Sequence, residues 1–190
     1  MRATSRRTRQ CGSDLSMINH ELKRELDLVA MAEVTPGLET AQAMRRGVRL
    51  LDSWRNGDHG AVLFWADREL DLWGHGHAVL HLVHCDLLDD AWRSRGGGGW
   101  STFTAAEILS ETGSGLHRLG GAAHDPVRVT LAIASLEVSS IQLRSAHGTA
   151  ERRPGEDGFC LFGITHHDPI TYARALDTRR EALPGEALLL

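Results

Sequence analysis

The chain has 190 residues, of which 42% are hydrophobic and 24% are charged, an ordinary balance for a globular protein that buries a core without disulfides or metals. Its net charge of −4 gives no reason to expect nucleic acid or an anionic membrane as a partner, and no run approaches the ~18 apolar residues of a transmembrane helix. The cysteines Cys11, Cys85 and Cys160 are too few for a disulfide framework, so we expect reduced thiols and a cytoplasmic location.

The N-terminal segment is expected to be a disordered basic tail over residues 1–12, because it is rich in arginine and serine. No apolar stretch follows Arg6-Arg7, so a signal peptide is not expected. Either Met1 or Met17 can be the natural start of the protein.

Residues 13–58 are predicted to form a helical hairpin. Ser13-Asp14 can cap a first helix from about Leu15 to Val34, which carries apolar residues at roughly helical spacing. Thr35-Pro36 is typical of a fresh helix start, so a second helix is expected from about Pro36 to Arg55. The apolar stripe of that helix would be formed by Met44, Val48, Leu51 and Trp54.

From residue 60 onward, short apolar runs alternate with turns, which predicts a β-rich domain over 60–190. The expected strands are 61–65, 70–73, 78–88, 91–95, 127–133, 138–143, 159–164 and 170–176. Gly96–Gly99 is interpreted as a flexible connector, since it lacks the Gly-Lys-Ser/Thr ending of a phosphate-binding loop. A capping box at Thr104–Glu107 predicts one short helix near 105–111, and Gly115, Gly120 and Gly121 make the next stretch loop-like.

Helices followed by strands favour the α+β class. We expect an N-terminal helical pair followed by a mainly antiparallel β-sandwich or barrel-like domain. The C-terminal third supports this most clearly, because Val127, Val129, Leu131 and Ile133 alternate with a period of two.

The segment from His75 to Cys85 holds four of the chain's 11 histidines. As a helix over 77–88, it would place His77, His81 and His84 on one stripe able to ligate a metal. As a strand, it would instead place His75 and His77 on one face, about 7 Å apart. We favour the strand, because Val79 and Val83 are β-branched and glycines precede the run.

The residues most able to form a metal site are this pair and a histidine-rich turn: His75, His77, His166, His167 and Asp168. Two histidines with a third histidine or a carboxylate suit Zn, Fe or Mn. A His-x-His pair on a strand resembles the histidine pair of the cupins, whose fold is a jelly-roll barrel. The glutamate expected after that pair is replaced by His81, and the histidine of the cupins' second motif is missing after Pro154, so we do not assign the chain to that family.

Trp73, Trp92 and Trp100 flank the histidine and glycine segments and could form a binding surface. No nucleophile elbow, His-Glu-x-x-His or Cys-x-x-Cys pair occurs in the sequence. The first hypothesis is therefore a cytosolic binding or interaction module with a protein or small-molecule partner. The alternatives are a small metal-dependent enzyme centred on His75 and His77, and a pH-sensitive interface protein. A homodimer remains open.

Overall fold

The computed structural model describes residues 11–37, 44, 46–70, 72, 77–101, 113–165, 170–183 and 188–189. Within these residues lie one helix, two short 3₁₀ turns and eleven strands. In chain order they are α1 (Cys11–Val34), β1 (Val48–Asn56), β2 (His59–Ala66), η1 (Arg68–Leu70), β3 (Val79–Leu88), β4 (Ala91–Ser101), β5 (Leu116–His124), β6 (Val127–Ala134), β7 (Ser140–Ser145), β8 (Gly148–Arg152), η2 (Glu156–Gly158), β9 (Phe159–Thr165), β10 (Ile170–Leu176) and β11 (Leu188–Leu189).

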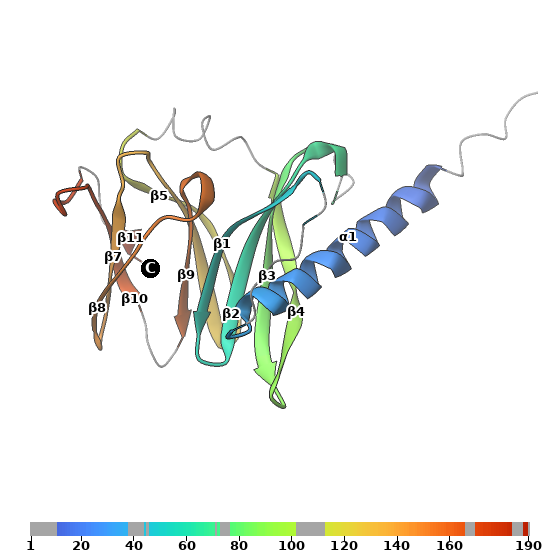
Figure 1. Ribbon diagram of the computed structural model, residues 1–190, viewed down its shortest axis with the longest axis horizontal. Coiled ribbons are helices and arrows are strands. Elements are labelled where there is room, and N and C mark those ends of the chain that lie inside the picture. Colours follow the sequence, from blue (N-terminus) through green and yellow to red (C-terminus); the bar gives the residue numbers. More distant parts are fainter. Residues whose placement is uncertain are drawn as a thin grey trace, which may run out of the picture.

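The described strands form three open sheets in which neighbours run antiparallel. Sheet A has the order β1-β2-β3-β4, sheet B the order β5-β6-β9, and sheet C the order β11-β10-β7-β8. Figure 1 shows α1, sheet A, sheet B and sheet C following one another as successive layers. The prediction of an α+β chain with mainly antiparallel strands is confirmed, whereas the barrel-like alternative is wrong.

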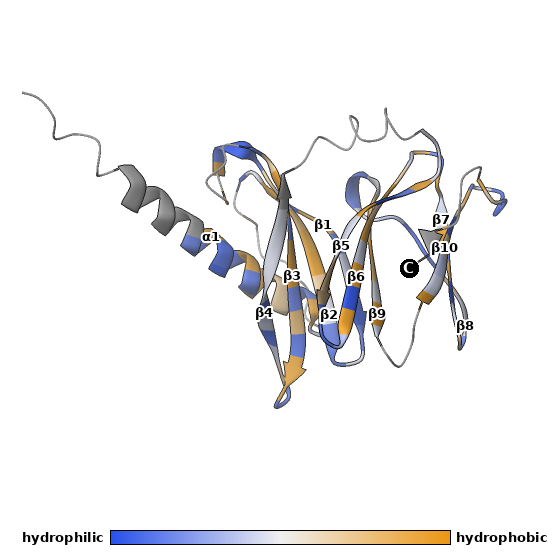
Figure 2. Ribbon diagram, turned by 180° about the vertical axis from the view of Figure 1, so that it is seen from behind, coloured by the Kyte–Doolittle hydropathy of each residue, from blue (hydrophilic) through white to orange (hydrophobic). Residues whose placement is uncertain are grey.

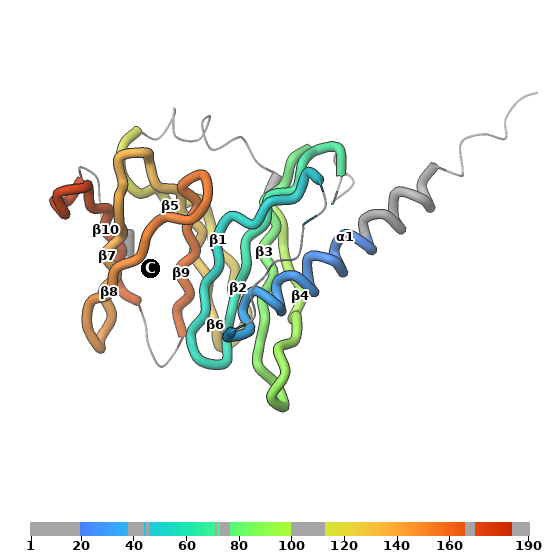
Figure 3. The backbone as a smooth tube through the Cα atoms, viewed as in Figure 1, coloured from blue at the N-terminus to red at the C-terminus, as the bar shows by residue number. Residues whose placement is uncertain are grey.

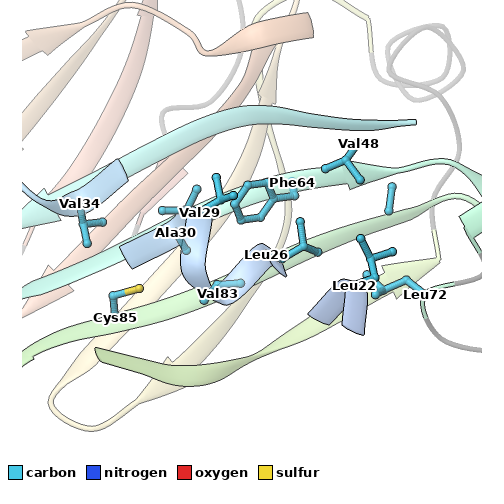
Figure 4. Close-up of a cluster of buried hydrophobic side chains, with 12 residues drawn as sticks. Leu22, Leu26, Val29, Ala30, Val34, Val48, Phe64, Leu72, Val83 and Cys85 are labelled. Atoms are coloured by element: carbon cyan, nitrogen blue, oxygen red, sulfur yellow. The ribbon is translucent and has the colours of Figure 1, made fainter. Parts of the chain in front are cut away.

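The helix α1 packs on one face of sheet A through an apolar stripe (Figure 4). The buried helical residues on this stripe are Leu22, Leu26, Val29, Ala30 and Val34. They meet Phe64 of β2, Val83 and Cys85 of β3, and Val48 of β1. The spacing of three and four residues that predicted this helix is thus the spacing of its buried face.

The opposite face of sheet A packs against sheet B. Leu63, Leu80 and Leu82 of sheet A meet Leu131 of β6 and Leu161 of β9 in a second apolar cluster. A third cluster lies between the other face of sheet B and sheet C. Because β6 and β9 are covered on both faces, hydrophobic residues recur along them (Figure 2).

The second predicted helix is wrong, because Val48–Asn56 is the edge strand β1 of sheet A. Val48 faces α1, whereas Leu51 belongs to the cluster between sheets A and B. A bulge between Leu50 and Asp52 leaves Leu51 without a partner in the ladder. A bulged strand with apolar residues on both faces has irregular apolar spacing. Here the apolar residues are three or four positions apart, which is also the spacing of a helix face.

Two glycine-rich stretches that we expected to be loops are strands. Gly96–Gly99 lies in β4 opposite β3, and Gly120 and Gly121 lie in β5 opposite β6. Glycine retains its backbone donor and acceptor, so a hydrogen-bonded ladder can include it despite its low strand propensity.

Several other predictions lie partly or wholly outside the described residues. These are the tail before Cys11 and the short helix near 105–111. The strand predicted over 70–73 is wrong where it is described, because Leu70 ends the turn η1 and Leu72 lies in a turn. The tail predicted over 1–12 is wrong at its end, because α1 begins at Cys11. Among the helices that are described, none combines the length and apolar character needed to cross a bilayer.

Candidate functional site

The predicted metal site lies largely outside the described residues. His75, His166, His167 and Asp168 are not described, and His77 is exposed just before β3. There it lines a cleft of about 740 Å³ together with Arg46, Asp67, Arg68 and Glu69. Within the part of the chain that is described, no group of three or more His, Cys, Asp or Glu side chains is arranged to hold a metal ion.

The alternative helical face of His77, His81 and His84 is wrong, because the segment is strand β3. Side chains three residues apart on a strand point to opposite faces. His81 lies on the face that packs against α1, and His84 lies on the face that packs against sheet B. His77 and His84 are seven residues apart, about 23 Å along a strand.

Two of the three tryptophans predicted to form a surface lie in β4, and Trp73 is not described. Trp92 packs against the cluster between α1 and sheet A. Trp100 pairs with Leu80 across the β3–β4 ladder. Their shared binding surface remains a prediction.

The structure gathers a different set of polar residues, which we call the histidine cluster: His59, His84, Asp86, Arg95 and His124. They come from β2, β3, β4 and β5, and therefore from both sheets A and B. His59 and Asp86 are direct cross-strand partners in the β2–β3 ladder. His84 and Asp86 are two residues apart on β3, so both face sheet B, where His124 ends β5.

Asp86 contacts both His59 and Arg95, and its side chain is only 13% exposed. His59 Nδ1 lies 2.9 Å from Asp86 Oδ1, and Arg95 Nε lies 3.3 Å from Asp86 Oδ2. A carboxylate can only accept, so His59 donates through Nδ1 and leaves Nε2 as the ring's other polar atom. The carboxylate thus fixes the orientation of both partners.

Arg95 also donates through Nε to His124 Nε2, at 3.2 Å. A guanidinium can only donate, so His124 Nε2 is the acceptor of this hydrogen bond. The same Nε2 atom lies 3.9 Å from Asp86 Oδ2, so His124 closes the cluster from sheet B.

A bulge in β4 gives Arg95 its position. In the β3–β4 ladder His84 pairs with Gly96 and Cys85 pairs with Ser94, so Arg95 is the extra residue. Gly96 has φ of +90°, which glycine adopts without the strain that a Cβ brings. Bulges commonly redirect a side chain out of a regular ladder. Arg95 belongs to the β3–β4 hairpin, which extends beyond the β1–β2 hairpin in Figure 3.

His84 is buried beside the cluster, with its ring centroid 6.0 Å from that of His124. Burial lowers the pKa of His84; the nearby His124 lowers it further, and Asp86 opposes the shift. Its neighbour Cys85 points the other way into the α1 core, where burial raises the thiol pKa to about 12. Cys85 therefore behaves as a small apolar residue.

Of the cluster, the sequence identified only His84. His59, Asp86, Arg95 and His124 were missed because they meet through strand pairing and not through proximity in sequence. Aligning the strand after Gly57 with the histidine strand would have paired His59 with Asp86. Arg95 and His124 were hidden because the glycine runs beside them were interpreted as loops.

A comparison with known protein families, curated proteins and solved structures finds no match to this chain.

Proposed function

We propose that this chain is a non-enzymatic binding module that recognises a carboxylate of a partner protein through the histidine cluster. The observation that carries the proposal is the state of Arg95. Its described contacts run through Nε alone, and its side chain is 44% exposed. The terminal nitrogens Nη1 and Nη2 form the planar fork that binds carboxylates in a bidentate manner.

Asp86 and His124 both engage Arg95 through Nε, so they hold the guanidinium while its terminal nitrogens face outward. A cytoplasmic location belongs to the same proposal, supported by the two free, buried thiols Cys85 and Cys160.

The test uses a hexaglutamate peptide as the probe and hexaglutamine as its neutral counterpart. Backbone amide chemical shifts of the full chain are followed during each titration. We expect saturable shifts around Arg95, His59 and His124 with hexaglutamate only.

Arg95→Gln should weaken that binding by about tenfold or more, because one bidentate charged contact is worth over 1.4 kcal/mol. The matched control is Arg174→Gln, an exposed arginine on β10 of sheet C that lies outside the cluster. Equal weakening by both variants would show only general charge attraction and would contradict the proposal. Sedimentation tests whether the partner is a second copy of the chain.

A metal-dependent enzyme remains the second candidate, supported by the exposed His77 beside Asp67 and Glu69 in the 740 Å³ cleft. Mass spectrometry of the untagged protein beside a His75→Ala/His77→Ala double variant tests it. Near-stoichiometric metal that disappears in the variant would favour this candidate over the binding module.

A further inference from the structure

Sheet C carries a polar cavity of about 490 Å³, which we call the arginine pocket. It lies where β7 begins, β8 ends and the turn after β10 passes. Its lining combines three guanidinium groups, three hydroxyls and one carboxylate, from Ser139, Ser140, Glu151, Arg152, Arg153, Thr178 and Arg180. None of these residues belongs to the histidine cluster.

The charges of the pocket do not balance. Arg152 pairs with the buried Asp52 and donates to the carbonyl oxygen of Leu161 at 2.7 Å, so these two partners hold its guanidinium in place. Arg180 pairs with Glu151. Within the described residues, the side chain of Arg153 has no acidic partner. Three guanidiniums thus face two carboxylates, and one positive charge is uncompensated.

Asp177 precedes Thr178 in the chain but does not line the pocket. Its Oδ1 accepts the backbone N–H groups of Arg179 and Glu181, both at 2.8 Å, which orients the carboxylate toward its own turn. Ser139 donates its hydroxyl to the carbonyl oxygen of Asp177 at 2.5 Å. The hydroxyls of Ser140 and Thr178 remain as neutral donors beside the guanidiniums.

We propose that the arginine pocket binds a small molecule through a phosphate group. Guanidinium forks and hydroxyls are the donors that phosphate oxygens accept, and phosphate offers more acceptor positions than a carboxylate. The pocket is broadly open to solvent, so it leaves room for the organic part of a ligand beyond its phosphate group. We therefore expect a phosphate monoester in preference to inorganic phosphate.

Binding at this pocket should also stabilise the fold. Arg152 joins sheet C to Asp52 of sheet A and to Leu161 of sheet B. A ligand held by the arginine pocket binds only where this junction is formed, so it raises the free energy of unfolding as its concentration exceeds Kd. Thermal unfolding is therefore a second measurement, independent of the binding isotherm.

The experiment titrates the full chain with inorganic phosphate, glycerol phosphate and acetate by calorimetry, with chloride holding the ionic strength constant. We expect saturable binding of glycerol phosphate, weaker binding of inorganic phosphate and none of acetate. Arg153→Gln and Thr178→Val should each weaken glycerol phosphate binding, the arginine variant by about tenfold or more. The control Arg144→Gln, an exposed arginine on β7 outside the pocket, should change Kd by less than about twofold.

If inorganic phosphate bound as tightly as glycerol phosphate, the pocket would still be a phosphate site, but its occupant would be the free ion and not a phosphate monoester. Acetate binding as tightly as phosphate would overturn the phosphate assignment. If Arg153→Gln and Arg144→Gln weakened glycerol phosphate binding equally, or if the binding heat did not saturate, the interaction would be general ion screening. Either result would overturn the proposal of a specific site. Each variant is first checked for a native circular dichroism spectrum. Because these residues lie apart from the histidine cluster, failure here leaves the proposed function untouched.

Discussion

Asp52 shows how one residue can join three sheets. It lies in β1 at the bulge, and only 6% of the residue is exposed. Its carboxylate accepts the backbone N–H of Leu161 in β9 at 2.6 Å and pairs with Arg152 of β8. Burial raises the pKa of Asp52, and the opposing effects of Arg152 and the hydrogen bonds do not cancel it. The carboxylate is thus costly to bury and is held by its partners.

Replacing this carboxylate should destabilise the protein strongly. Asp52→Asn leaves Arg152 inside the junction without a counter-charge, and breaking one side of a buried ion pair typically costs about 3–5 kcal/mol. Urea unfolding followed by circular dichroism measures the loss. The control Asp58→Asn, in the exposed turn before β2, should stay within about 0.5 kcal/mol of the parent. A similar midpoint for Asp52→Asn and the parent would mean that the ion pair does not hold the junction.

At the scale of elements, β4 is the strand that sequence patterns describe worst. Four consecutive glycines suggest a loop, yet they pair with β3 from His81 to His84. A Cβ on Gly97 would lie 2.1 Å from the carbonyl oxygen of Leu82, whereas nothing lies within 4 Å of a Cβ on Gly98. One glycine of the run is therefore required by close approach, and its neighbour is not.

This difference gives a prediction with a built-in control. Gly97→Ala must move β4 away from β3 and should cost about 1–3 kcal/mol. Gly98→Ala has room and raises strand propensity, so its free energy of unfolding should equal or exceed that of the parent by up to about 1 kcal/mol. Denaturant unfolding of the two variants compares them directly. Equal destabilisation would place these glycines in a loop, as the sequence suggested.

Elements with one regular period were predicted, and the others were not. The helix α1 buries one stripe, β6 begins with a period-two alternation, and β9 is a mostly apolar run, so their patterns identified them. Strands β1, β4 and β5 each contain a bulge or a glycine run, which breaks the alternation. The histidine cluster depends on these irregular strands, since Arg95 is itself a bulge residue. For that reason the sequence found only His84 of its members.

At the scale of the whole molecule, two histidines lie between layers. His81 faces α1 from β3, and His84 faces sheet B from the same strand. Burial, with a smaller effect of Lys23 on α1, lowers the pKa of His81 to about 4. Burial also lowers the pKa of His84. Protonating either ring places a charge inside an interface between layers. Acid should therefore weaken the packing of α1 and sheet B against sheet A.

The sign of the pH dependence follows from these shifts. The pKa of His81 falls from 6.5 to about 4 on folding, so the unfolded chain binds more protons below pH 6.5. The stabilisation is fully present above pH 6.5 and is lost as the pH falls toward 4. His81 alone should lower the free energy of unfolding by about 3 kcal/mol over this window, and His84 acts in the same direction.

The measurement is the free energy of unfolding in urea at several pH values between about 7 and 4 for the parent, His81→Phe and His77→Gln. His81→Phe should lose less stability than the parent across that window, by about 3 kcal/mol, whatever its stability at neutral pH. His77→Gln removes an exposed histidine next to the same strand and should follow the parent curve. Parallel curves for the parent and His81→Phe would mean that His81 accepts its proton without penalty, and that the interface between α1 and sheet A is open to water.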